Sequence, residues 1–161
     1  MTTNHALTLR PVTPEDDAFL FEVYAGTRWE ELAPVPWDEA QKNAFLTLQF
    51  NAQHQHYRSE FANADFDVIL DDGTPVGRLY VDRRADEIRI LDMALLPTHR
   101  GRGIGSALLG VLLAEAEAAR TPVRIFVEQP RAQRLFERFG FELAEDRGVA
   151  VLMEWRPGGD G

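Results

Sequence analysis

The chain has 161 residues, of which 45% are hydrophobic and 27% charged, a balance typical of one globular domain with a buried core. It contains no cysteine, which excludes disulfides, thiolate metal sites and an acyl-cysteine intermediate. Its formal net charge of -9 disfavours a nucleic-acid partner, because an acidic protein repels phosphates.

Strand and helix signals alternate along the N-terminal half. A strand is expected over residues 6–10, and Thr13 is placed to cap a helix over 14–25, which Gly26 is expected to end. Asp38 is expected to cap a second helix, over residues 39–55. Two strands are predicted after it, over 65–70 and 75–82, joined through an Asp-Asp-Gly turn.

The C-terminal half continues the alternation. Its predicted elements are a strand over 87–96, a helix over 105–119, a strand over 123–127, a helix over 131–139 and a closing hairpin of 141–145 and 149–156. The order predicts an α/β fold with a mixed central sheet of about seven strands, flanked by about four helices. No apolar run approaches the ~20 residues of a membrane span, and no signal-peptide pattern is present, so we expect a cytoplasmic protein without a membrane partner.

A glycine-rich loop connects the strand over 87–96 to the helix that follows. Residues 100–106 read Arg-Gly-Arg-Gly-Ile-Gly-Ser. Glycines let a ligand lie against bare backbone, the helix N-terminus adds unpaired N–H groups, and Arg100 and Arg102 supply mobile positive charge. The loop therefore predicts a phosphate site. Its G-x-G-x-G spacing fits neither the P-loop nor the dinucleotide fingerprint.

The loop resembles that of the GNAT superfamily of acyl-CoA-dependent N-acyltransferases. Arg100, Gly103 and Gly105 match its Arg-x-x-Gly-x-Gly signature, placed after a strand that ends in apolar-x-Pro. Residues 129–141 resemble a later family segment, Asn-x-x-Ala-x-x-Leu-Tyr-x-x-x-Gly-Phe. The positions in register there are Ala132, Leu135, Gly140 and Phe141. Residues 7–16 also look like the family's first strand and helix cap, so the resemblance spans nearly the whole chain.

The resemblance implies a single GNAT-like domain over 1–156, and we expect a disordered tail over 157–161. It implies acetyl-CoA or a similar short acyl-CoA as co-substrate, no metal, and direct transfer to a primary amine of a small molecule or peptide. Backbone N–H groups near Met93 to Leu95 would stabilise the oxyanion. The residues that it assigns to CoA are Met93, Ala94, Leu95, Arg100, Gly101, Arg102, Gly103, Ile104, Gly105, Ser106, Gln129 and Phe136.

A general base is needed because an alkylammonium must lose a proton before it attacks. The candidates on strands are Glu87, Asp92 and Glu128, of which Asp92 and Glu128 are the predicted catalytic residues. A structural role for Asp92 and a solvated strand end for Glu128 are the competing interpretations. The family often carries an acid at the position of Arg89, so that assignment does not transfer to this chain.

The family's usual acid, a tyrosine near the departing sulfur, is also missing. Phe136 occupies the matching position and has no proton to donate, although a thiolate can leave without a strong acid. Tyr24, Tyr57 or Tyr80 could substitute from another element, or all three could serve packing. This departure keeps open a rival hypothesis, in which the protein is a catalytically weak CoA-binding sensor or interaction module.

The acceptor site is assigned by resemblance to the segment Trp29, Glu30 and Glu31. The sequence does not choose among several possible acceptors, which are an amino acid, a polyamine, an antibiotic, a protein N-terminus and a protein lysine. His54 and His56 are expected at the surface rather than at a metal, since residues two apart on a helix point to different sides. The last strand could expose an edge to a second chain, which makes a homodimer one alternative.

Overall fold

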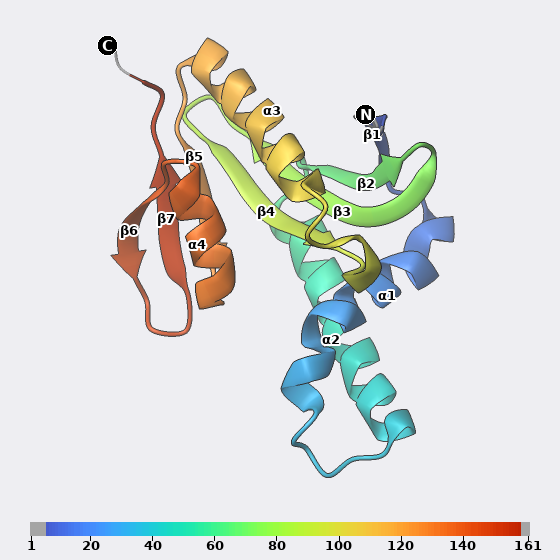
Figure 1. The fold of residues 1–161 in the computed structure, drawn as a ribbon. Coiled ribbons are helices and arrows are strands. Elements are labelled where there is room, and N and C mark those ends of the chain that lie inside the picture. The colour runs from blue at the N-terminus through green and yellow to red at the C-terminus, as the bar shows by residue number, and fades with distance from the viewer. Residues whose placement is uncertain (1–5, 159–161) are drawn as a thin grey trace. The chain divides into compact units, whose positions relative to one another are not determined.

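The computed structural model describes residues 6–158. Within them, seven strands form one mixed sheet in the order β1-β2-β3-β4-β5-β7-β6, with four α-helices along the chain (Figure 1). This confirms the predicted α/β fold class. The strands are β1 (Leu7–Pro11), β2 (Asp65–Asp71), β3 (Thr74–Arg83), β4 (Ile88–Leu95), β5 (Val123–Val127), β6 (Glu142–Asp146) and β7 (Val151–Trp155). The helices are α1 (Asp17–Arg28), α2 (Glu39–Glu60), α3 (Ile104–Ala119) and α4 (Pro130–Arg138).

The chain gathers into two compact units. Within residues 6–158, one contains residues 6–79 together with Met93–Gly105, and the other contains Tyr80–Asp92 together with residues 106–158. Strands β3 and β4 therefore each contribute residues to both units. The predicted single domain over 1–156 stays a prediction.

The start of α1 shows how local hydrogen bonds fix the N-terminal segment. Thr13 caps a short 3-10 turn, and its N–H donates to the Asp16 carboxylate at 2.7 Å. The same carboxylate accepts two hydrogen bonds from Arg10, at 2.7 and 2.8 Å, which ties β1 to the helix. The Arg10 hydrogen bonds lower the pKa of Asp16 well below its usual range. Asp16 is therefore ionised at neutral pH and contributes to the stability of this corner.

Gly26 does not end α1, contrary to the prediction. The helix continues to Arg28, and a 3-10 turn carries the chain on to Leu32. Gly26 has no positive φ, so its conformation is not the reason for a glycine there. A Cβ at this position would lie 3.1 Å from Cδ of Pro97, a contact too tight for most side chains. The glycine permits the close approach of another segment rather than a turn.

Helix α2 begins where the sequence predicts. Asp38 accepts from the Gln41 N–H at 2.8 Å, and the Gln41 side chain accepts from the Asp38 N–H at 2.9 Å, which completes a capping box. The helix extends five residues beyond the predicted end, to Glu60. The aromatic rings of Tyr57 and Phe61 pack together at the end of this extra turn, with their centroids 6.4 Å apart.

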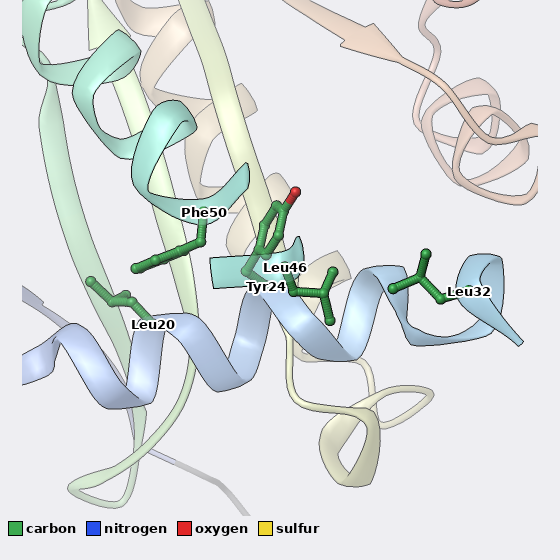
Figure 2. Packing of buried hydrophobic residues seen from close by; sticks show 5 residues of the cluster. All are labelled: Leu20, Tyr24, Leu32, Leu46 and Phe50. Carbon is green, nitrogen blue, oxygen red and sulfur yellow. The ribbon is translucent and has the colours of Figure 1, made fainter. Parts of the chain in front are cut away.

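A hydrophobic cluster joins α1 to α2 in the first unit (Figure 2). Leu20 and Tyr24 come from α1, Leu46 and Phe50 from α2, and Leu32 from the 3-10 turn, all buried. Figure 2 shows the Phe50 ring lying between the two helices. This cluster accounts for one face of α1, and Val23, which is also buried, lies outside it.

The second unit is built on strand pairs of unequal length. β5 pairs with β7 in antiparallel fashion over its full length, residues 123–127, whereas its parallel pairing with β4 covers only residues 88–90 with 123–125. Phe136 of α4 is buried and packs edge-on against Phe141, with ring centroids 5.2 Å apart. Of the predicted disordered tail, the Gly158 N–H donates to Glu117 at 3.0 Å, and residues 159–161 lie outside the described part.

Candidate functional site

The glycine loop after β4 exposes bare backbone, as predicted. Gly101 and Gly103 have φ angles of 75° and 80°, a region that favours glycine. A Cβ built on either residue would meet nothing within 4 Å, so both face open space. Gly105 differs, because it lies in the first turn of α3, and a Cβ there would meet Cε of Met93 at 3.9 Å. Two of the three glycines are therefore required by backbone conformation.

The start of α3 directly follows these two glycines. The first N–H groups of a helix have no acceptor within it, so those of Ile104 and Gly105 are available to an anion beside the exposed loop. Arg102 is exposed, and among residues 6–158 no hydrogen bond or ion pair to its guanidinium is found. The residues of this loop fit the diphosphate of an acyl-CoA, since they offer N–H donors and a free cation.

Arg100 plays a different part from the one expected. Its Nε donates to the carbonyl oxygen of Leu95 and its Nη2 to that of Gly26, both at 3.2 Å. The side chain is therefore held between the end of β4 and α1 rather than being mobile. It fixes the position of the loop and leaves its charge beside the exposed glycines.

The end of β4, where oxyanion donors are expected, is shaped by a glycine that the sequence analysis missed. A Cβ at Gly77 of β3 would overlap with the carbonyl oxygen of Ala94 and lie 2.8 Å from Cδ2 of Leu95. The strand continues into the loop through a hydrogen bond from the Leu96 N–H to the Val76 carbonyl, at 2.8 Å. Gly77 therefore allows β3 to approach Met93–Leu95 more closely than any residue with a side chain would. A single glycine within a strand was the available signal.

The predicted catalytic acids lie in the second unit. Asp92 is half-buried in β4, two residues after the last residue paired with β5, and Glu128 is exposed directly after β5 ends. Because β4 and β5 run parallel, both acids follow the carboxyl ends of paired segments, an edge at which ligands commonly bind. Their catalytic roles stay predictions.

Glu87, the third acid considered as a base, is committed to a cluster of ion pairs. Its buried carboxylate accepts from Arg124 at 3.0 Å and from Arg84 at 3.3 Å, and Arg89 lies 3.5 Å away. Arg124 also pairs with Glu154 at 2.7 Å. A carboxylate among several guanidinium groups holds the strands together rather than accepting a substrate proton. Arg89, at the family's acidic position, belongs to the same cluster.

Two residues assigned to CoA lie at α4. Phe136 is only 4% exposed, so its ring fills the core of the second unit and offers a ligand little surface. Gln129 is exposed at the N-terminus of α4. Ser106, the last residue of the glycine loop, also belongs to this unit.

Tyr24, one candidate for the missing acid, is buried and its hydroxyl donates to Gln49 at 3.2 Å. It therefore has a structural role.

Only part of the predicted acceptor segment lines a pocket of about 430 Å³ in the first unit. Trp29 and Glu30 line it, whereas the exposed Glu31 carboxylate pairs with Arg28 at 3.3 Å and is not a lining residue. Sequence reasoning missed Glu22, another lining residue, although its spacing of seven from Trp29 places the two on one helical face. The full lining is Glu22, Ala25, Gly26, Trp29, Glu30, Leu96, Pro97, Thr98 and Arg100.

Within residues 6–158, no group of three or more His, Cys, Asp or Glu side chains is arranged to hold a metal ion. Each helix of the same residues is too short or too polar to span a membrane.

Comparison with known proteins shows the fold and the family of the chain. The structure is similar to that of PaiA N-acetyltransferase from Thermoplasma acidophilum in complex with coenzyme A, with a TM-score of 0.68 and 18% identity, covering 94% of this chain and 99% of that one. It is also similar to an acetyltransferase from Thermus thermophilus, with a TM-score of 0.67 and 20% identity, covering 93% and 96% of the two chains. Residues 27–141, well over half of the chain, match the model of the acetyltransferase (GNAT) family. The chain therefore belongs to the acetyltransferase (GNAT) family.

Proposed function

We propose that the protein transfers an acetyl or short acyl group from acyl-CoA directly to a primary amine. The observation that carries the proposal is the loop of Gly101 and Gly103, whose exposed backbone precedes the free N–H groups of α3. Diphosphate binding at such a loop needs no dedicated side chain beyond Arg102. Membership of the acetyltransferase family supplies the acyl chemistry.

The reaction balances without a covalent enzyme intermediate. The ammonium form of the acceptor loses one proton, and the neutral amine then attacks the thioester carbonyl carbon. The C–N bond forms, the C–S bond breaks, and the products are the amide, the CoA thiol and one released proton. N–H groups of Met93–Leu95 would stabilise the oxygen that becomes negative during attack. Asp92 or Glu128 would receive the acceptor's proton, directly or through water.

Calorimetric titration tests the binding half of this proposal. We expect acetyl-CoA and desulfo-CoA to bind with micromolar affinity, and NAD and ATP to bind at least tenfold more weakly. The Arg102→Ala variant should lose affinity for both CoA species without losing thermal stability, since its side chain makes no hydrogen bond or ion pair within the described part of the fold. Equal binding of NAD or ATP, or no binding of CoA by the folded protein, would refute the assignment of the loop.

The sensor hypothesis shares this binding and differs in turnover. Phe136 favours it, because a buried ring without a hydroxyl cannot protonate the departing thiolate. Thiol release from acetyl-CoA in the presence of amines separates the two functions. A sensor would bind acetyl-CoA with the same affinity and release no thiol above the uncatalysed rate.

A further inference from the structure

The pocket beside α1 has the dimensions of a small-molecule site. Its volume of about 430 Å³ lies within the usual range for such sites, and all its lining residues belong to the first unit. One wall combines Glu22, Ala25 and Gly26 of α1 with Trp29 and Glu30 of the 3-10 turn that follows it. The other wall is the segment 96–100 that leads into the glycine loop.

Two small residues of α1 lie in the wall of the pocket. Gly26 and Ala25 lie between the two longer residues of the helix face, and Gly26 is already close to Pro97. Arg100, which also lines the pocket, is held by the carbonyl oxygens of Leu95 and Gly26. A ligand in the pocket would therefore lie beside the same arginine that begins the glycine loop.

Two carboxylates and the guanidinium of Arg100 line the pocket, so its charged groups are negative in sum and favour a cation. The carboxylates of Glu22 and Glu30 have no ion pair or hydrogen bond among the residues that the structure describes, whereas the carboxylate of the adjacent Glu31 is paired with Arg28. Trp29 is 40% exposed, and the Lys42 ammonium lies 5.9 Å from its ring centroid. The indole ring is therefore able to make a cation–π contact with an ammonium group. The pocket thus combines apolar walls, two unpaired carboxylates and an indole ring.

We infer that this pocket binds a primary amine with an apolar body, such as an arylalkylamine, and that this class of amine is the acyl acceptor. The inference of binding stands on the pocket alone, and only the role as acceptor depends on the proposed function. A polyamine carries charges along its whole length and would leave the apolar walls without an apolar partner. Because the two carboxylates outnumber Arg100, which is already held by two carbonyl oxygens, they disfavour a ligand whose only charge is negative.

Calorimetry on the full chain without CoA tests the inference, with phenethylamine as the probe. Hydrocinnamate has the same aromatic body with a negative charge, and spermidine has positive charge without an apolar end. We expect phenethylamine to bind at least tenfold more tightly than either. Binding of hydrocinnamate or spermidine as tight as that of phenethylamine, or no binding of phenethylamine, would overturn the inference.

Two pairs of variants place the amine in this pocket. Glu30→Gln should weaken phenethylamine binding about fivefold to tenfold, whereas Glu31→Gln, one residue away, should leave it within twofold. Trp29→Ala should weaken it about tenfold, whereas Trp37→Ala, which removes an equally exposed indole at 39%, should not. Equal losses within either pair would overturn the assignment to the pocket. Circular dichroism of each variant confirms that it is folded.

Failure of the proposed function gives a different result. If the protein binds phenethylamine but neither binds nor cleaves acetyl-CoA, the acyltransferase proposal fails and the amine pocket stands. If it cleaves acetyl-CoA only with acceptors that do not compete with phenethylamine, the acyltransferase proposal stands and the inferred acceptor class is wrong.

Discussion

Replacing Gly77 with alanine should disturb the end of β4 selectively. The added methyl group would overlap with the Ala94 carbonyl oxygen and press on Leu95, whose Cα would lie at 3.1 Å. Both obstacles include backbone, so no side-chain rotation relieves them and the strands must separate. We expect a loss of about 1–3 kcal/mol in the free energy of unfolding, as for other overpacked sites.

The assay combines thermal unfolding with kinetics. For a chain of this length, that loss lowers Tm by about 2–12 °C. Because the shift moves the N–H groups predicted to stabilise the oxyanion, kcat should fall about tenfold to a hundredfold when measured well below Tm. The Kd of acetyl-CoA should change less, since the glycine loop itself is not displaced by the substitution.

Gly110→Ala is the matched control. Gly110 lies in α3, and a Cβ there would meet nothing within 4 Å. The substitution should raise the free energy of unfolding by about 0.5–1 kcal/mol, through the helix propensity of alanine, and leave kcat unchanged. If Gly77→Ala kept both the Tm and the kcat of the original protein, the reasoning about the close approach of β3 to Ala94 would be refuted.

Three further predictions concern the loop and two ion pairs. Arg100→Ala should lower both Tm and CoA affinity, because its side chain joins two segments, whereas Arg102→Ala should lower affinity alone; equal Tm values for the two variants would contradict this division. Asp16→Asn should cost about 1–2 kcal/mol near neutral pH in urea unfolding. Because the Arg10 hydrogen bonds lower the pKa of Asp16, its contribution to stability is complete above about pH 4 and is lost as the pH falls through the folded-state pKa. A difference in unfolding free energy between the original protein and Asp16→Asn that stays the same below that pKa would count against the Arg10 pair. Glu87→Gln should cost about 3–5 kcal/mol in the same assay and leave CoA affinity unchanged, and a stable variant would show that the buried carboxylate does not hold the cluster.

Local signals made much of the fold predictable. The capping box of Asp38 and Gln41 and the strand over 123–127 depend on neighbours in sequence, and both appear where they are expected. Gly101 and Gly103 were predictable for the same reason, since their conformation is set within one loop. A resemblance over nearly the whole chain added the family, which composition and periodicity alone do not give.

Contacts between distant segments account for what was missed. Gly26 gives the signal of a helix end, but it is required by Pro97, about seventy residues further on. Gly77 gives no signal of function until Ala94 lies against it. Glu87 carries the charge of a base, and only the arrival of Arg124 shows that it is part of an ion-pair cluster.

The pocket beside α1 shows the same limit. Trp29 and Glu30 were assigned by resemblance. Glu22 lines the same pocket as Trp29 because α1 continues through Gly26, which the sequence analysis did not predict. The separation of Glu30 from Glu31 depends on a pairing with Arg28 that sequence alone does not fix. The sequence shows which side chains carry charge. The fold decides which of them are paired with another side chain and which can bind a ligand.

The most direct measurement counts both products of the proposed reaction. Acetyl-CoA and a panel of primary amines are incubated with the protein, free thiol is measured colorimetrically, and the acetylated amine is quantified by mass spectrometry. We predict that thiol and amide appear in equal amounts, at rates proportional to protein concentration. Thiol without amide, or neither product at protein concentrations that bind acetyl-CoA fully, would contradict direct acyl transfer to an amine.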